Sequence, residues 1–297
     1  MEIQVDMLQQ DWTATIALLL LPVVLFGIGC DPSFDPLQEN DRYFFSIYGY
    51  LDASADTQWV RIAPVRDSLN AIPEEIDATV TLEHLTSGEI AVMNDSLFEF
   101  FHGVRAHNFW TTMDLQPGET YRLGVEASDG RSSHATVTLP SDFPAPLLRI
   151  AYKAIEGRDV VYIEGAERLA DVQVRYHYRP AAGRAPMYPV PHIQDTVRTS
   201  PSTYEVLVDP KFEEDYRERY FPAGIGGSFL YKEVFVAAAG PDWHPFATID
   251  EKIIALPEGI SNVENGVGYV AGIVSKTIPY VSCWDELGNF IGCPAEE

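Results

Sequence analysis

The 297-residue sequence is poor in basic residues, and this shortage narrows the classes of protein to which it can belong. Only 20 lysines and arginines stand against 44 aspartates and glutamates, which gives a formal net charge of -24. A surface this acidic repels phosphate backbones and excludes a nucleic-acid-binding protein. Hydrophobic residues at 46% and charged residues at 22% are ordinary for a globular chain, so a disordered chain is excluded as well.

Catalytic and metal-binding motifs are also missing. The sequence contains no G-x-S-x-G, H-E-x-x-H, C-x-x-C or P-loop motif, and the glycine-rich residues 224–227 lack the lysine and hydroxyl residue that phosphate binding needs. His102 and His107 are five residues apart and are interpreted as ordinary histidines rather than metal ligands. The acidic residues 213–215 are interpreted as a solvated surface. These features predict a protein that is not an enzyme and that uses no metal and no cofactor; an enzyme is the less favoured alternative.

Cysteine is scarce too, with three in the whole chain. Cys283 and Cys293 flank a segment in which Gly288 and Asn289 tolerate the positive φ of a tight turn. We therefore expect these two cysteines to form a disulfide across a hairpin in an oxidising compartment, which would stabilise the fold by roughly 2 to 3 kcal/mol. The alternative is two unrelated buried thiols.

The third cysteine, Cys30, ends a stretch of 19 uncharged residues, 12–30. This stretch is long enough to span a membrane, but it contains Pro22 and ends with Gly27 and Gly29 before the cysteine. It resembles a bacterial lipoprotein signal, so residues 1–29 are predicted to be a signal peptide and Cys30 the lipidated first residue. An uncleaved membrane anchor and a secreted soluble chain are the alternatives. The acidic, proline-rich residues 30–41 are predicted to be a tether.

Residues 42–140 read as short strands separated by turn residues at intervals of about ten, as in an immunoglobulin-like antiparallel β-sandwich. Alternation is clear around Val80 and Leu82, and no long helical period interrupts it. Tyr121 follows Leu115 by six residues and Gly118 by three, and this spacing resembles the tyrosine corner of fibronectin type III and related domains. The prolines in residues 140–146 indicate a stiff linker.

Residues 147–297 are predicted to form a second β-rich domain with one short helix and a C-terminal hairpin, so the fold class is mainly all-β. Asp209 and Pro210 open the predicted helix, with i,i+4 pairs from Glu213 to Arg217 and from Asp215 to Arg219. Residues 179–195, rich in proline and glycine, are predicted to be a long loop. A second sandwich and an extension of the first sheet are both compatible with the pattern. Tyr188 and Trp243 fall in proline-rich segments and are candidate ligand or partner contacts, the alternative being core positions.

Four stretches together resemble a family of Bacteroidota-type lipoproteins with a domain of unknown function: the N-terminal signal, "FFSIYGYLDASADTQWVRI", "LQPGETYRLGV" and "NVENGVGYVAGIVSKTIPY". The resemblance implies a lipid-anchored protein of the outer membrane, typically encoded beside a TonB-dependent receptor. It predicts a non-enzymatic binding or accessory role, such as assisting that receptor in nutrient uptake. A direct carbohydrate- or peptide-binding lipoprotein that uses loop aromatics is the alternative.

Overall fold

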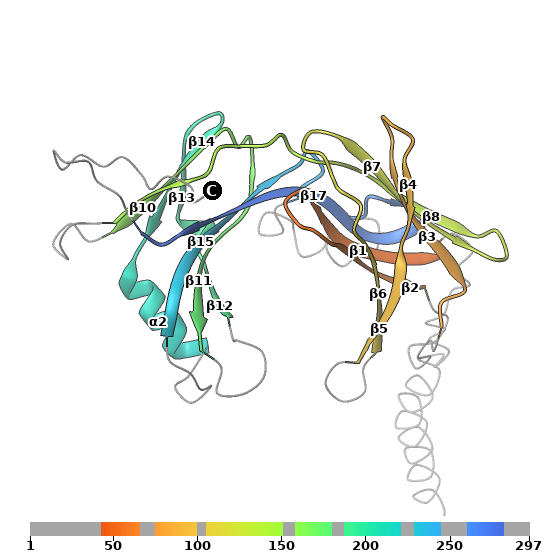
Figure 1. Ribbon diagram of the computed structural model, residues 1–297, viewed down its shortest axis with the longest axis horizontal. Coiled ribbons are helices and arrows are strands. Elements are labelled where there is room, and N and C mark those ends of the chain that lie inside the picture. The colour runs from red at the N-terminus through yellow and green to blue at the C-terminus, as the bar shows by residue number, and fades with distance from the viewer. Residues whose placement is uncertain are drawn as a thin grey trace, which may run out of the picture. The chain divides into compact units, whose positions relative to one another are not determined.

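The computed structural model describes residues 43–65, 75–99, 105–150, 158–179, 187–220, 229–244 and 260–281. These residues contain 17 strands, the α-helix α2 (Pro210–Tyr220) and the short 3-10 helix η2 (Ile193–Asp195) (Figure 1). The predicted all-β class is therefore confirmed. Cys30, Cys283 and Cys293 lie outside the described residues. Within the described ranges, no helix is long and apolar enough to cross a membrane.

The strands form three sheets of eight, five and four strands. The largest has the spatial order β12 (Met187–Pro191), β11 (Leu169–Tyr178), β15 (Phe229–Ala239), β17 (Gly266–Pro279), β1 (Phe45–Asp52), β2 (Gln58–Pro64), β6 (Arg105–Thr111), β5 (Asn94–Glu99). The five-stranded sheet has the order β16 (Val263–Glu264), β8 (Ser132–Thr138), β7 (Thr120–Ala127), β3 (Ala78–His84), β4 (Ile90–Val92). The four-stranded sheet has the order β13 (Thr196–Ser200), β14 (Thr203–Val208), β10 (Asp159–Glu164), β9 (Leu147–Arg149).

Two hydrophobic clusters hold these sheets together. In the first, the alternating side chains of β3 and β7, such as Leu82 and Leu123, pack with residues of β1, β2 and β6. In the second, Val172 and Val174 of β11 pack with residues of β10, β14 and β15. Each smaller sheet therefore buries its apolar face against part of the eight-stranded sheet, as a sandwich does.

The long strand β17 contributes to both clusters and joins them. Val270 belongs to the first cluster and Val274 to the second. The strand pairs with β15 antiparallel on one side and with β1 parallel on the other. The parallel pair differs from the purely antiparallel sandwich that the sequence predicts. Because β17 pairs with β1 on one side and with β15 on the other, one continuous sheet covers both hydrophobic clusters.

The predicted loop over residues 179–195 is corrected in part. Met187–Pro191 form strand β12, which pairs with β11 at the edge of the eight-stranded sheet. Proline cannot donate a ladder hydrogen bond, but it is tolerated in an edge strand, where one side of the backbone has no neighbour. The loop prediction is wrong for these residues because Pro189 and Pro191, which argue against a strand inside a sheet, are compatible with a strand at its edge.

Tyr121 on β7 makes the contact expected of a tyrosine corner. Its side chain is fully buried, and its hydroxyl accepts a hydrogen bond from the backbone N–H of Gln116 at 2.8 Å. We expect Tyr121→Phe to lower the free energy of unfolding by about 2 kcal/mol, since it leaves that N–H without its acceptor. Urea denaturation measures the loss, and Tyr48→Phe, at a half-exposed ring, is the matched control. An equal effect of the two changes would contradict the prediction.

Candidate functional site

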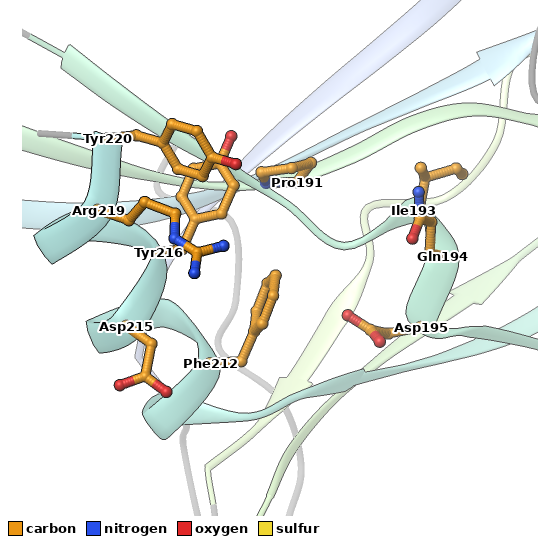
Figure 2. A pocket seen from close by; sticks show the side chains of 9 residues that line it. All are labelled: Pro191, Ile193, Gln194, Asp195, Phe212, Asp215, Tyr216, Arg219 and Tyr220. Atoms are coloured by element: carbon orange, nitrogen blue, oxygen red, sulfur yellow. The ribbon is translucent and has the colours of Figure 1, made fainter.

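A groove of about 560 Å³ lies between helix α2 and the segment that runs from the end of β12 through η2 (Figure 2). Three aromatic side chains, Phe212, Tyr216 and Tyr220, line the helical wall. Polar groups stand beside them on both walls, and the complete lining is Pro191, Ile193, Gln194, Asp195, Phe212, Asp215, Tyr216, Arg219 and Tyr220. The groove thus combines flat apolar surfaces with carboxylate, amide and guanidinium groups.

The local sequence explains why α2 forms where the sequence predicts it. Pro210 occupies the first helical position, and Asp209 Oδ1 accepts a hydrogen bond from the backbone N–H of Lys211 at 2.9 Å, which caps the helix. Phe212, Tyr216 and Tyr220 are four residues apart, so they lie on one face of the helix. Their rings follow one another with centroid distances of 5.9 and 4.6 Å.

The two end rings of this aromatic face are open to solvent, whereas Tyr216 between them is half-buried and packs against the second hydrophobic cluster. Phe212 is 42% exposed and Tyr220 is 56% exposed. An isolated exposed aromatic needs no explanation, but a row of three rings beside a groove, with two of them exposed, is typical of a binding surface. This stripe was not predicted from the sequence, although its i, i+4, i+8 spacing is visible there.

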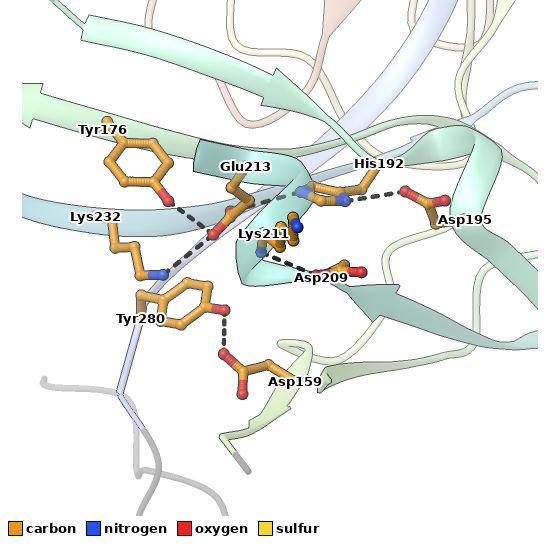
Figure 3. A network of polar contacts seen from close by, with 9 residues as sticks. All are labelled: Asp159, Tyr176, His192, Asp195, Asp209, Lys211, Glu213, Lys232 and Tyr280. Atoms are coloured by element: carbon orange, nitrogen blue, oxygen red, sulfur yellow. Dashed lines mark hydrogen bonds and ion pairs between the residues drawn. The ribbon is translucent and has the colours of Figure 1, made fainter. Parts of the chain in front are cut away.

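Glu213 lies on the same helix but is buried, with 1% of its surface exposed. The prediction of a solvated acidic surface is therefore wrong for this residue. The Tyr176 hydroxyl donates a hydrogen bond to Glu213 Oε2 at 2.7 Å, and Lys232 Nζ lies 3.4 Å from the same oxygen (Figure 3). The predicted partner Arg217 donates to the Tyr178 hydroxyl at 3.2 Å and packs over the Tyr176 ring.

His192 connects this buried carboxylate to the wall of the groove. Its imidazole is fully buried, with Nε2 3.5 Å from Glu213 Oε1 and Nδ1 3.1 Å from Asp195 Oδ2 (Figure 3). Asp195 is itself partly exposed and lines the groove. His192 therefore lies between the two walls of the groove, with a carboxylate of η2 on one side and a carboxylate of α2 on the other.

The charges of this network determine its protonation. Burial by itself raises the pKa of a carboxylic acid, but the contacts with His192, Lys232 and Tyr176 outweigh it, so the pKa of Glu213 is lowered from its ordinary value of 4.5. Burial raises the pKa of the Tyr176 hydroxyl, and the adjacent Glu213 charge raises it further. Tyr176 therefore stays protonated at neutral pH, and its hydroxyl donates a hydrogen bond to the Glu213 carboxylate.

A second buried pair continues the network away from the groove. The Tyr280 hydroxyl donates to Asp159 Oδ2 at 2.5 Å, and Lys232 Nζ lies 3.5 Å from the centre of the Tyr280 ring. Burial, followed by the hydrogen bond to Asp159, raises the pKa of Tyr280. The ammonium group of Lys232 is thus surrounded by the Glu213 carboxylate and an aromatic face, both of which stabilise its charge.

The groove can recognise a ligand by stacking and hydrogen bonding. His192 has no exposed surface and cannot touch a ligand, so its interaction with Asp195 is a positioning contact. Within the ranges that the structure describes, no group of three or more His, Cys, Asp and Glu residues is placed to hold a metal ion. Of the two histidines considered in the sequence, His107 is buried against Asp95, with Nδ1 2.8 Å from Oδ2, and His102 lies outside the described residues.

The aromatic residues singled out from the sequence lie elsewhere. Tyr188 is half-buried on strand β12, where its ring meets Tyr178 edge-on at 5.4 Å. Trp243 is half-buried with its ring 5.5 Å from Tyr50 and 6.4 Å from Tyr269. The two belong to different aromatic clusters, and neither lines the groove.

No protein-family model matches the sequence, and no curated protein matches it. Among solved structures, the crystal structure of pullulanase from Anoxybacillus sp. LM18-11 is similar with a TM-score of 0.23 and 10% identity, over 64% of this chain and 24% of that chain. The structure of pullulanase complexed with maltotriose from the same organism gives a TM-score of 0.22 and 9% identity, over 65% of this chain and 24% of that one. The chain matches only about a quarter of the length of either, and TM-scores this low support no conclusion.

Proposed function

We propose that the protein is a non-enzymatic binding protein whose groove beside α2 takes a neutral oligosaccharide. The observation that carries this proposal is the row of Phe212, Tyr216 and Tyr220 along one wall, with planar polar groups next to it. A sugar ring has apolar C–H faces and a rim of hydroxyl groups. Aromatic rings cover the former, while carboxylate, amide and guanidinium groups bind adjacent hydroxyls in pairs.

The charges in the groove favour a neutral ligand over an anionic one. Asp195 and Asp215 supply two carboxylates, whereas Arg219 is the single basic residue in the lining. The net charge of -24 on the whole chain repels anions over a longer range. A polyhydroxylated neutral ligand meets no such repulsion and uses both the acceptors and the donor.

The wall geometry suits a ligand of several sugar units. The three rings are spread along nine residues of helix, from Phe212 to Tyr220, so they extend over about two turns, or roughly 12 Å. A single sugar covers one ring, and successive units of a chain reach the next. Longer oligosaccharides are therefore expected to bind more tightly than monosaccharides.

The test is titration of the purified protein with neutral gluco-oligosaccharides of one to six units, both α- and β-linked, by calorimetry. We expect saturable binding that strengthens with length, and roughly tenfold weaker binding by Phe212→Ala and by Tyr216→Ala, which is about 1.4 kcal/mol each. Tyr231→Ala is the matched control because Tyr231 is 52% exposed and lies on β15, outside the groove. Binding that is equally strong in all variants, or no binding by any member of the series, would contradict the proposal.

We also infer that the groove is displayed in the cell envelope by a lipid on Cys30. The support is the uncharged segment that ends at Cys30 and the acidic tether that follows it. The family resemblance supports a TonB-dependent outer-membrane receptor as a partner that would receive the ligand. Detergent extraction and pull-down of the native protein, with Cys30→Ala as the control, tests both points. A wild-type protein that is recovered without lipid and without a barrel partner would refute them.

A further inference from the structure

The segment Ile90 to Glu99 forms the free edge of two sheets. Strand β4 (Ile90–Val92) is the last strand of the five-stranded sheet, and β5 (Asn94–Glu99) is the last strand of the eight-stranded sheet. Only Met93 separates them, so one stretch of ten residues closes both sheets on the same side of the first core (Figure 1). On its outer side, the segment has no neighbouring strand among the residues that the structure describes.

This edge lacks the lysine and proline that usually protect an edge strand, although β4 is only three residues long and β5 carries the acids Asp95 and Glu99. Natural proteins blunt edge strands with lysine, proline, a bulge or a covering segment, because an open edge pairs with other chains. The sequence of the segment, IAVMNDSLFE, contains no lysine and no proline. By contrast β12, at the other end of the eight-stranded sheet, carries Pro189 and Pro191.

The edge is instead apolar and accessible. Ile90 is 59% exposed and Val92 is 65% exposed on β4, while Leu97 is 44% exposed and Phe98 is 41% exposed on β5. Large apolar side chains are unusual on a protein surface when they are gathered along ten residues of backbone whose outer side has no strand neighbour among the described residues. Together they offer both main-chain hydrogen-bonding groups and apolar contacts to an added strand.

The two faces of β5 differ in chemistry. Phe98 lies on the face of the sheet where its ring meets Trp59 edge-on at 5.7 Å, and Trp59 in turn lies 6.0 Å from Trp110. Asp95 and Glu99 have the opposite parity and lie on the other face. Asp95 Oδ2 lies 2.8 Å from His107 Nδ1, and Glu99 Oε2 lies 4.0 Å from Arg105 Nε. The side chain of Asp95 is 40% exposed and that of Glu99 is 65% exposed, so both carboxylates are accessible to an added strand.

We propose that this edge accepts an extended strand of a partner protein in which apolar residues alternate with lysine or arginine. The added strand pairs with β5, its apolar side chains continue the aromatic face at Phe98, and its basic side chains lie beside Asp95 and Glu99. The net charge of -24 attracts such a segment before contact. This is strand addition, in which main-chain bonds give affinity and alternate side chains give specificity.

A second copy of this chain fits the same edge less well. Antiparallel pairing of two β5 strands centred on Leu97 places Asp95 opposite Glu99 of the second copy, and like charges directly opposite each other destabilise a pair of strands. The charge of -24 on each chain adds to the repulsion. A basic partner strand meets no such repulsion, and it can form hydrogen bonds with the same backbone N–H and C=O groups of β5.

The probe for this proposal is a labelled eight-residue peptide of alternating valine and lysine, titrated into the full-length protein by fluorescence anisotropy. A peptide of equal charge with proline in place of each valine is the control for attraction by charge alone. We expect saturable binding of the first, at least tenfold weaker binding of the second, and protection from hydrogen exchange at Ile90 to Glu99 in the complex.

The double variant Leu97→Lys/Phe98→Lys is expected to bind the valine–lysine peptide at least tenfold more weakly, because it places charge on both faces of the edge. Val197→Lys is the matched control, since Val197 is 52% exposed on another edge strand, β13. The groove variant Phe212→Ala is expected to bind the peptide normally, which separates this proposal from the oligosaccharide site. Equal binding of both peptides, protection elsewhere in the chain, or a dimer that the peptide does not dissociate would overturn the proposal.

Discussion

Glu213→Gln is expected to lower the free energy of unfolding by about 3 kcal/mol. The change removes the negative charge that lies between Lys232 and His192, and removal of one partner from a buried ionic network costs far more than loss of a surface pair. Urea denaturation of the two proteins measures the difference. Glu214→Gln is the matched control, because Glu214 is the next residue on the helix and is exposed, so its effect is expected within about 0.5 kcal/mol of zero.

The pH dependence of this difference tests its ionic origin. Because the pKa of Glu213 is lowered in the folded protein, its ionised form stabilises the fold above its unfolded pKa, and this contribution is lost as the pH falls through the folded pKa. The difference in free energy of unfolding between wild type and Glu213→Gln is therefore expected to be constant from pH 7 to about 5 and to decrease below about pH 4.5. A gap of the same size at pH 3.5 would show that the loss comes from packing instead.

Gly268→Ala is expected to have the second large effect, a loss of about 4 kcal/mol or more. Gly268 has a φ of 126° on strand β17, and an added Cβ would lie 2.0 Å from the carbonyl oxygen of Ile47 on β1. The three atoms nearest to that Cβ are all backbone atoms of Ile47, so no side chain can move to relieve the clash. The parallel pair of β1 and β17 has to separate, which places this change among the exceptional ones.

The same variant tests whether the two hydrophobic clusters unfold together. Strand β17 contributes Val270 to one and Val274 to the other, so a separated β17 weakens both. We expect a single transition with the same midpoint by tryptophan fluorescence and by circular dichroism. The matched control is Gly130→Ala, which also has a positive φ of 87° but has nothing within 4 Å of the added Cβ, and its cost is expected to be about 1 kcal/mol. Two separate transitions in Gly268→Ala would contradict a shared unit.

The fold class could be predicted because the local pattern is strong. Alternation in β3 and β11 fixes which side chains face the core, and Val80, Leu82, Val172 and Val174 are buried as that alternation requires. The parallel pairing of β1 with β17 could not be predicted, because the residue pattern of a strand does not indicate which distant strand lies next to it in the sheet. Strand β12 was missed because an edge position, which makes its prolines acceptable, is a property of the assembled sheet.

The candidate site was predictable only in part. The helix start at Asp209 and Pro210 is a local signal and was found. The burial of Glu213 depends on partners 37 residues earlier, at Tyr176, and 19 residues later, at Lys232. In a chain with 44 acidic residues, an acid on a helix is expected to be solvated, and only the assembled network shows the exception.

The pairing of β1 with β17 also determines when the chain can complete its fold. Phe45 lies beside Gly266, and the Ser275 hydroxyl donates to Asp52 across 223 residues of sequence. During synthesis, β1 emerges early but has no parallel partner until β17 has been made, so the first core stays open on that side. Contacts of such long sequence separation close slowly because the entropy of a large loop is lost before the contact is gained. Refolding is therefore expected to be slow, and nascent chains stopped before β17 are expected to remain sensitive to proteases.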